Sequence, residues 1–306
     1  MLDADTTLAR ALRFADEEPT ALLAIVGPTA SGKTDLAMRI AERIDGEVVS
    51  IDSVQIYRGF DIGSGKPTAD ELARVRHHGI DIVGPLEKID AARFADFARA
   101  AIEDIRARGK RPIVCGGTYL WVKALLYGLA DAPPASEEIR ARHRALVEAE
   151  GRPALHVALA KVDPTIAERL HPNDFVRVSR ALEVYELTSE PMSAWQARHG
   201  FSTPRMEARL VALAVDPDEL TLRIAARVHR FMLAGWLDEV RALRDSGFEH
   251  ARAMGSVGYR EILHDLAKPE AERSAPGDLE AEIVRATRVF ARRQRTWLHH
   301  ANVTWL

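Results

Sequence analysis

Residues 27–34 have the composition and spacing of a phosphate-binding loop. They read G-P-T-A-S-G-K-T, which fits the pattern G-x-x-x-x-G-K-[ST]. The glycines let successive backbone N–H groups face an anion, the lysine adds positive charge, and the final hydroxyl is a ligand for Mg²⁺. The pattern predicts a phosphate ligand, which in most proteins is a nucleoside triphosphate used for phosphoryl transfer. The residues expected to bind the phosphates are Gly27, Thr29, Ala30, Ser31, Gly32, Lys33 and Thr34, with Thr34 also binding the metal.

Further motifs follow this loop in regions that lie far apart in the sequence. They read S-I-D-S-V-Q-I-Y-R-G at 50–59, D-I-G-S-G-K-P at 61–67, G-G-T-Y-L at 116–120, H-P-N-D at 171–174 and V-G-Y-R-E at 257–261. Together with residues 27–34, they closely resemble the bacterial tRNA dimethylallyltransferase family, also called IPP transferases, from about residue 21 to residue 305. One departure is that the family usually has G-T-A-K-P or G-T-N-K-P where residues 63–67 read G-S-G-K-P. Ser64 keeps the hydroxyl, whereas Gly65 is expected to loosen that loop.

The resemblance implies a prenyl transfer to tRNA. The family moves a dimethylallyl group from dimethylallyl diphosphate to N6 of the adenosine immediately 3′ of the anticodon, position 37, in tRNAs that read codons beginning with U. The exocyclic amine of adenine is a poor nucleophile because its lone pair is delocalised into the ring, so a base near the nitrogen is expected. Asp52 is the candidate, since it follows an expected strand of a parallel sheet, and ligands bind at the carboxyl ends of such strands. In a phosphoryl-transfer enzyme the same aspartate would instead help to hold Mg²⁺.

The departing diphosphate needs positive charge around it, because the allylic carbon becomes cationic as the diphosphate leaves. Lys33, Mg²⁺ bound to Thr34 and an arginine are expected to supply that charge. The resemblance implies that the arginine lies in a helix containing residues 222–227, and the sequence does not choose between two candidates there. It also places a threonine beside the reaction channel. The predicted catalytic residues are Asp52, Thr118, Arg223 and Arg227.

A basic stripe near the C-terminus is the best candidate for an RNA-binding surface. Arg285, Arg288, Arg292 and Arg295 are separated by three, four and three positions, which places them along one face of a helix. Such a stripe can neutralise backbone phosphates, although a merely solvated charged face is the more common meaning of this pattern. The resemblance favours RNA, because residues 292–298 match a tRNA-contacting segment of the family. The contacts implied are Arg292, Arg293, Gln294, Arg295, Thr296 and Trp297.

Other tRNA contacts are implied by the resemblance alone. One group would receive the target base after its extrusion from the stack: Asp52, Ser53, Val54 and Gln55. A second group would belong to a clamp around the anticodon stem–loop: Arg140, Val176, Arg177, Val178, Ser179 and Arg180. A third group surrounds the V-G-Y-R-E motif: Gly255, Ser256, Val257, Gly258, Tyr259 and Arg260.

The elements that carry these residues predict an α/β fold. Strand segments are expected at 21–26, 47–51, 112–115, 209–215 and 303–306, and helices at 35–44 and within 220–243. Strands that alternate with helices favour a P-loop NTPase-like parallel sheet core. In the middle of the chain apolar residues recur at helical spacing without a strand signal. The expected organisation is a flexible, solvated N-terminal extension at 1–20, a core formed by 21–131 and 202–306, and an all-helical insertion at 132–201.

The bulk composition indicates an ordinary soluble globular protein. Of the 306 residues, 47% are hydrophobic and 28% are charged, and the formal net charge is −3, so the chain as a whole gives no sign of nucleic-acid binding. The single cysteine excludes an internal disulfide and favours a reducing cytoplasm. The histidines lack a metal-ligand spacing, and no segment has the length and apolar character of a signal peptide or a membrane span. A monomer is expected.

Three other functions fit parts of the pattern. A P-loop kinase of nucleotides or small metabolites would bind ATP at residues 27–34. A nucleotide-gated RNA-binding protein would bind tRNA without catalysis. A related enzyme would prenylate free adenylates, but the basic stripe and the large helical insertion favour a macromolecular acceptor.

Overall fold

The computed structural model describes residues 4–201, 203–299 and 301–306. Residues 1–3 of the predicted extension and residue 202 at the predicted domain boundary lie outside the described residues. The chain forms two compact units: the core unit, Met1–Leu126 with Arg205–Leu306, and the helical unit, Tyr127–Pro204. The helical unit therefore extends slightly beyond both ends of the insertion expected at 132–201.

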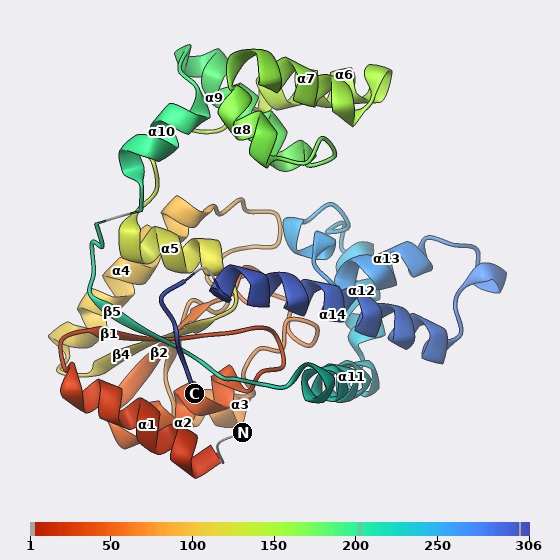
Figure 1. Ribbon diagram of the computed structural model, residues 1–306. Helices are drawn as coiled ribbons and strands as arrows, with labels where there is room; N and C mark the ends of the chain where they lie inside the picture. Colours follow the sequence, from red (N-terminus) through yellow and green to blue (C-terminus); the bar gives the residue numbers. More distant parts are fainter. Residues whose placement is uncertain (1–3, 202, 300) are drawn as a thin grey trace. The chain divides into compact units, whose positions relative to one another are not determined.

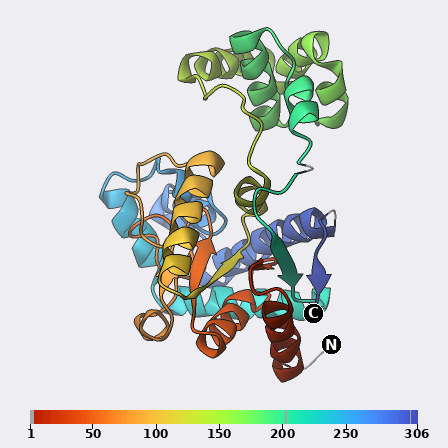
Figure 2. The same cartoon turned by 90° about the vertical axis from the view of Figure 1, so that its left-hand side faces the viewer.

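A six-stranded sheet with parallel pairings forms the centre of the core unit (Figure 1). Its strand order is β3-β2-β4-β1-β5-β6, and Figure 2 shows β5 and β6 side by side at one edge. The expected parallel α/β core is confirmed, and β3 is an additional strand that no apolar run indicates. The strands are β1 (Leu22–Val26), β2 (Gly46–Ile51), β3 (His77–His78), β4 (Arg111–Gly116), β5 (Ala208–Ala212) and β6 (Thr304–Trp305).

Helices cover both faces of this sheet, which explains why its central strands are nearly continuous apolar runs. On one face, α2 (Lys33–Arg43) and α1 (Ala4–Glu17) share a hydrophobic cluster with the inward side chains of the strands. On the other face lie α4 (Ala91–Ala107) and α5 (Tyr119–Tyr127), where Phe94 stacks on Trp121 at a centroid distance of 4.2 Å. The sheet is thus a rigid base for the loops at its edges.

Helix α1 corrects the expectation of a flexible, solvated extension over residues 1–20. Leu8, Ala11 and Ala15 are buried in the cluster that α1 shares with α2. Asp5 forms an ion pair with Arg39 of α2 at 2.6 Å. Residues 1–20 contain five acidic residues, but the apolar residues of the helix recur three and four positions apart, and that spacing gives the helix one face to bury.

The remaining helices of the core unit are α3, which follows β2, and the helices that follow β5. Helix α11 begins where the Asp216 carboxylate accepts hydrogen bonds from the N–H groups of Asp218 and Glu219. Among the described residues, no helix combines the length and the apolar character that a membrane crossing requires. These helices are α3 (Ala69–Arg74), α11 (Pro217–Leu233), α12 (Trp236–Asp245), α13 (Tyr259–Leu266) and α14 (Pro276–His299), with short 3-10 turns at Arg252–Gly255 and Glu270–Glu272.

The helical unit has a hydrophobic cluster of its own, in which Leu155, Leu159 and Val178 are buried. Two carboxylates of the helical unit are buried among the described residues: Asp163, whose Oδ1 accepts a hydrogen bond from the Ile166 N–H, and Glu183, which accepts hydrogen bonds from Arg140 and Arg180. The helices are α6 (Glu137–Glu150), α7 (Arg152–Val162), α8 (Pro164–Arg169), α9 (Phe175–Thr188) and α10 (Met192–His199).

Candidate active site

Three strand ends meet at one edge of the sheet. The register pairs Val26 of β1 with Gly116 of β4, and pairs Gly116 also with Ile51 of β2. The chain therefore leaves the sheet at one level in three places: the phosphate loop after β1, Asp52 after β2 and Gly117 after β4. Ligands of open parallel sheets bind at this edge. Strand register thus brings the predicted phosphate loop and the predicted base together.

The phosphate loop, residues 27–34, leads into the start of α2. Gly32 has a φ of 93°, a left-handed conformation that glycine adopts without strain. Ser31 is only 1% exposed, and its hydroxyl has no hydrogen-bond partner among the described residues. A buried hydroxyl without a partner is rare in proteins, and an oxygen atom of a bound phosphate would supply one.

Lys33 brings a positive charge to the loop, and its ammonium donates a hydrogen bond to the Pro28 carbonyl at 3.2 Å. Burial is the main cause that lowers the pKa of Lys33; Cys115 opposes the shift, Arg227 adds to it and Asp52 opposes it. Desolvation disfavours the charged form of Lys33. An anion bound beside Lys33 would therefore stabilise the ammonium, and the ammonium would neutralise the charge of the anion. Burial also raises the pKa of the Cys115 thiol to about 11, so this cysteine is an inert strand residue.

Asp52 is held in a tight turn directly after β2. Its Oδ1 accepts hydrogen bonds from the backbone N–H groups of Val54, at 2.8 Å, and Gln55, at 3.3 Å. Thr118 is tied to the same turn, because its Oγ1 accepts a hydrogen bond from the Ser53 N–H at 3.1 Å. The structure therefore brings Asp52, Ser53, Gln55 and Thr118 into one hydrogen-bonded group.

The two candidate arginines of α11 both reach this region, at different places. Arg223 donates a hydrogen bond to the carbonyl of Ser31 in the phosphate loop at 3.3 Å. Arg227 donates to the carbonyl of Ser64 at 3.4 Å and lies over the ring of Phe231. Burial lowers the pKa of Arg227, and the charge of Asp52 opposes that shift. Arg223 thus contacts the phosphate loop, and Arg227 lies close enough to Asp52 for their charges to interact.

Gln294 was expected to contact tRNA, but its side chain bonds within the protein. Its Oε1 accepts a hydrogen bond from the Thr29 N–H of the phosphate loop at 2.9 Å, and its Nε2 donates to the Gly117 carbonyl at 3.0 Å. A small hollow beside these bonds is lined by Gly27, Gly117 and Tyr119, among others. Gln294 therefore links helix α14 to the loops after β1 and β4.

The predicted basic stripe lies on the outside of α14. Arg285, Arg288, Arg292 and Arg293 are exposed and Arg295 is half-buried, and none of the five forms an ion pair with an acid of the described residues. Trp297 is 48% exposed, and its ring lies 6.5 Å from that of Tyr119. These arginines are accessible to a polyanion.

Several other predicted RNA contacts are enclosed and need correction. The side chains of Val178 and Ser179 are buried in the helical unit, where Ser179 hydrogen-bonds His143. Tyr259 is 1% exposed and bonds Glu239. Gly258 is buried too, and a methyl group added there would lie 1.9 Å from the Trp236 ring. Consecutive positions on a helix point in different directions, so a run of neighbours cannot all face one RNA.

The remaining predicted contacts are at least partly accessible, although some are engaged. Arg140 and Arg180 are half-buried and both pair with Glu183. Arg260 is exposed and pairs with Glu261. The other accessible positions are Val54, Val176, Arg177, Gly255, Ser256, Val257 and Thr296.

Glu239 belongs to the surroundings of the site, although sequence reasoning did not single it out. Its carboxylate accepts hydrogen bonds from the backbone N–H groups of residues 61–63, within the D-I-G-S-G-K-P motif. The sequence shows the motif, but it does not predict that Glu239 contacts the motif, because Glu239 lies on an amphipathic helix far along the chain.

A parallel sheet with a phosphate loop after its first strand and an acid after its second defines a P-loop enzyme of the α/β class. The sequence model of the IPP transferase family matches residues 55–301. The chain is similar to the tRNA dimethylallyltransferase of Sorangium cellulosum, with 59% identity over 294 residues, which cover 96% of this chain and 92% of that protein.

Solved structures show the same similarity to enzymes that transfer a prenyl group to tRNA. The chain is similar to the tRNA isopentenylpyrophosphate transferase of Bacillus halodurans, with 37% identity and a TM-score of 0.67 over 94% of this chain and 89% of that one. It is also similar to a eukaryotic dimethylallyltransferase acting on tRNA, with 27% identity and a TM-score of 0.71 over 91% of this chain and 70% of that one. The chain belongs to the IPP transferase family.

Proposed function

We propose that the protein transfers the dimethylallyl group of dimethylallyl diphosphate to N6 of the adenosine 3′ of the anticodon, position 37, in tRNAs that read codons beginning with U. The observation that carries this proposal is the aligned strand ends, which bring an anion-binding loop to the Asp52 turn in a chain of the IPP transferase family. The names of its relatives, tRNA dimethylallyltransferases, support tRNA as the acceptor.

The phosphate loop is proposed to bind the diphosphate of the donor. The buried Ser31 hydroxyl, the Lys33 ammonium and the Arg223 guanidinium, which bonds the Ser31 carbonyl, are proposed to bind its phosphate oxygens. Hydroxyl and carboxylate oxygens are the protein ligands that Mg²⁺ prefers, and the chain offers the exposed Thr34 at this loop. We therefore propose that Thr34 and the diphosphate hold Mg²⁺, which would neutralise charge on the leaving group.

Asp52 is proposed to be the general base. A bond forms from adenine N6 to C1 of the prenyl group, the bond from C1 to the diphosphate oxygen breaks, and diphosphate leaves with that electron pair. The proton of N6 passes to the carboxylate of Asp52. Two backbone N–H groups on Oδ1 fix this carboxylate, and the N–H of the next residue, Ser53, bonds the Thr118 hydroxyl. Arg227, opposite in charge to Asp52, is proposed to stabilise the departing diphosphate.

The exposed arginines of α14 are proposed to contact tRNA phosphates, and Arg177 of the helical unit is proposed to make a further contact. We also propose that the protein works as a monomer in the cytoplasm. Its single cysteine, Cys115, is buried and reduced, which is compatible with a reducing compartment.

One experiment decides between this function and a P-loop kinase. An anticodon stem–loop is incubated with the protein and either γ-labelled ATP or labelled dimethylallyl diphosphate, and the product base is identified by mass. We expect label on the RNA from dimethylallyl diphosphate only. Labelled phosphate on an acceptor, with no prenylated adenosine, would support the kinase.

Asp52→Ala tests the base directly. We expect the rate of prenylation to fall by about 100- to 10,000-fold, while the affinity for tRNA changes only a few-fold, because a base acts in the chemical step alone. Asp70→Ala, which removes an exposed carboxylate from α3, is the matched control and should leave the rate unchanged. An unchanged kcat for Asp52→Ala would remove Asp52 from this role.

A further inference from the structure

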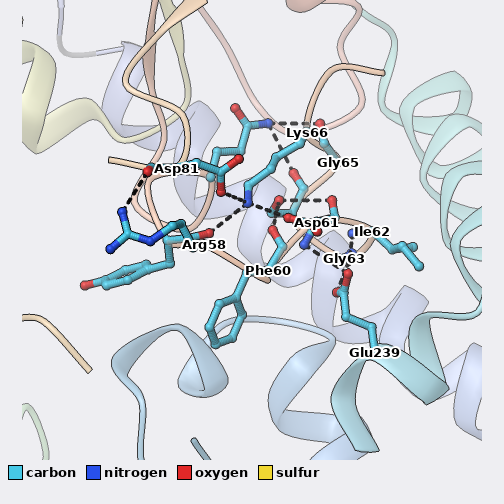
Figure 3. Close-up of polar contacts among 12 residues, drawn as sticks. Arg58, Phe60, Asp61, Ile62, Gly63, Gly65, Lys66, Asp81 and Glu239 are labelled. Atoms are coloured by element: carbon cyan, nitrogen blue, oxygen red, sulfur yellow. Dashed lines mark hydrogen bonds and ion pairs between the residues drawn. The ribbon is translucent and has the colours of Figure 1, made fainter. Parts of the chain in front are cut away.

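Residues 60–66 form a compact loop that follows the Asp52 turn, called the 60–66 loop below (Figure 3). The Ser64 hydroxyl donates to the Phe60 carbonyl at 2.6 Å, and the Gly65 N–H donates to the Ile62 carbonyl at 2.9 Å. The Lys66 ammonium donates to the Tyr57 carbonyl at 2.8 Å and pairs with Asp61 at 2.6 Å. These bonds give the loop a defined internal shape.

Glu239 of α12 holds one side of this loop (Figure 3). Its Oε2 accepts hydrogen bonds from the N–H groups of Asp61, at 2.9 Å, and Ile62, at 2.6 Å, and its Oε1 accepts from Gly63 at 3.3 Å. The Tyr259 hydroxyl donates to Oε1 at 2.6 Å and so orients the carboxylate. Bonds from N–H groups to a carboxylate are among the stronger hydrogen bonds in proteins, and three of them here come from consecutive residues.

The other side of the loop faces two residues of the candidate site. The side-chain amide of Gln55 donates to the Ser64 carbonyl at 3.3 Å and to the Gly65 carbonyl at 2.9 Å. Arg227 also donates to the Ser64 carbonyl. The N–H of Gln55, in turn, is one of the two donors to Asp52. The loop therefore connects the Glu239 carboxylate to Gln55 and Arg227.

Close packing makes this arrangement sensitive to the loop's position. A methyl group added to Gly63 would lie 1.9 Å from Nε1 of Trp236, so the backbone rests directly on that ring. A methyl group added to Gly65 would lie 2.2 Å from Nη2 of Arg227. Gly65 has a φ of 64°, a left-handed conformation, and its missing side chain leaves the space that Arg227 occupies.

We infer that Glu239 is a positioning residue for prenyl transfer. It fixes the N–H groups of residues 61–63, and the 60–66 loop then sets the Ser64 and Gly65 carbonyls that hold Gln55 and Arg227. Glu239 itself does not touch the reacting atoms. This inference rests on the proposed function, in which Arg227 stabilises the departing diphosphate, and on the expectation that Gln55 helps to receive the target base.

Glu239→Gln is the test, because it keeps the size of the side chain but replaces one acceptor oxygen by a donor and removes the charge. We expect kcat to fall by about 10- to 100-fold and KM for dimethylallyl diphosphate to rise several-fold, while the affinity for tRNA without donor stays within about two-fold. Native-state hydrogen exchange should accelerate at residues 61–63. Asp238→Asn, on the same helix but exposed and paired only with Arg241 among the described residues, should change none of these quantities.

The outcomes separate this inference from the proposed function. Faster exchange at residues 61–63 with unchanged kcat and KM would overturn the positioning role. A wild-type protein that makes no prenylated RNA would overturn the proposed function, whatever the variant does. If circular dichroism shows that Glu239→Gln does not fold, Ser64→Ala replaces it, since it loosens the loop without touching α12. That variant should lose kcat by several-fold, and wild-type kinetics in it would overturn the inference.

Discussion

Gln294 shows how a residue of the C-terminal helix can act on the donor site. Gln294→Ala removes the acceptor for the Thr29 N–H and the donor to the Gly117 carbonyl, so the phosphate loop loses its link to the loop after β4. We expect KM for dimethylallyl diphosphate to rise about tenfold, since a hydrogen bond that orders a binding loop contributes about 1 kcal/mol or more. Steady-state kinetics with saturating RNA measures this.

The control for Gln294 lies two positions further along the same helix. The Thr296 hydroxyl bonds only the carbonyl of Arg292 in its own helix, as far as the described residues show. Thr296→Ala should therefore leave KM for the donor unchanged. Equal KM values for wild type and Gln294→Ala would mean that the phosphate loop keeps its shape without α14.

The sequence alone is enough to predict that Gln294 and Arg292 lie on different faces of this helix. The spacing of Arg292 and Arg295 predicts their common face, and two positions along a helix correspond to a rotation of about 200°, so Gln294 has to point away from Arg292. The partners of Gln294 could not be predicted, because its contacts with Thr29 and Gly117 span most of the chain. Asp52 was easier to place, since its position after a strand fixes the edge of the sheet at which it lies.

At the scale of elements, the sequence best predicts the strands that are buried on both faces of the sheet. The apolar runs of β1, β2 and β4 identify themselves because each is covered by helices on both faces. Strand β3 consists of two histidines at the sheet edge, so it has no apolar signal, and its pairing with β2 follows from tertiary contacts. Helix α1 was missed for a different reason: its acidic residues concealed a valid apolar stripe.

Strand β2 carries a buried carboxylate whose ionisation stabilises the fold. Glu47 is 4% exposed and accepts hydrogen bonds from the Arg108 guanidinium, and its Oε2 lies at hydrogen-bond distance, 2.6 Å, from Nε2 of His78. The hydrogen bonds from Arg108 are the largest cause that lowers the pKa of Glu47 from its ordinary 4.5 to about 2; burial opposes the shift. Because the folded pKa is the lower one, this stabilisation is complete above about pH 4.5 and is lost as pH falls from there towards 2.

Glu47→Gln should therefore reduce the free energy of unfolding at pH 7 by about 2 kcal/mol, the typical contribution of hydrogen bonds between charged groups, because the partly exposed Arg108 keeps Asp104 as a partner. The difference from wild type should shrink between pH 4.5 and pH 2, where the wild-type carboxylate also becomes neutral. Urea unfolding at several pH values measures both. Glu42→Gln, which removes a largely exposed ion pair with Arg74, should cost less than about 1 kcal/mol. A constant difference across this pH range would show that Glu47 stabilises the strand without its charge.

At the scale of the whole molecule, charge distribution matters more than total charge. The net charge of −3 gives no general attraction to RNA, so binding has to come from local groups. The arginines fall into two kinds. Those on the outer face of α14 have no acidic partner among the described residues, whereas Arg140 and Arg180 neutralise the buried Glu183 of the helical unit.

This difference predicts opposite behaviour for two arginine-to-alanine variants. Arg292→Ala should weaken tRNA binding more at low salt than at high salt, reducing the slope of log K against log [salt] by about 1, with an unchanged melting temperature. Arg140→Ala should leave that slope unchanged, but it deprives the buried Glu183 of one of its two arginine partners, so it should destabilise the helical unit by up to about 3 kcal/mol. Binding titrations at several salt concentrations measure the first effect. Hydrogen exchange measures the second, as a loss of protection within residues 127–204 while β1, β2 and β4 keep theirs. If Arg140→Ala changes the slope as Arg292→Ala does, Arg140 meets phosphate directly and its pairing with Glu183 opens when RNA binds.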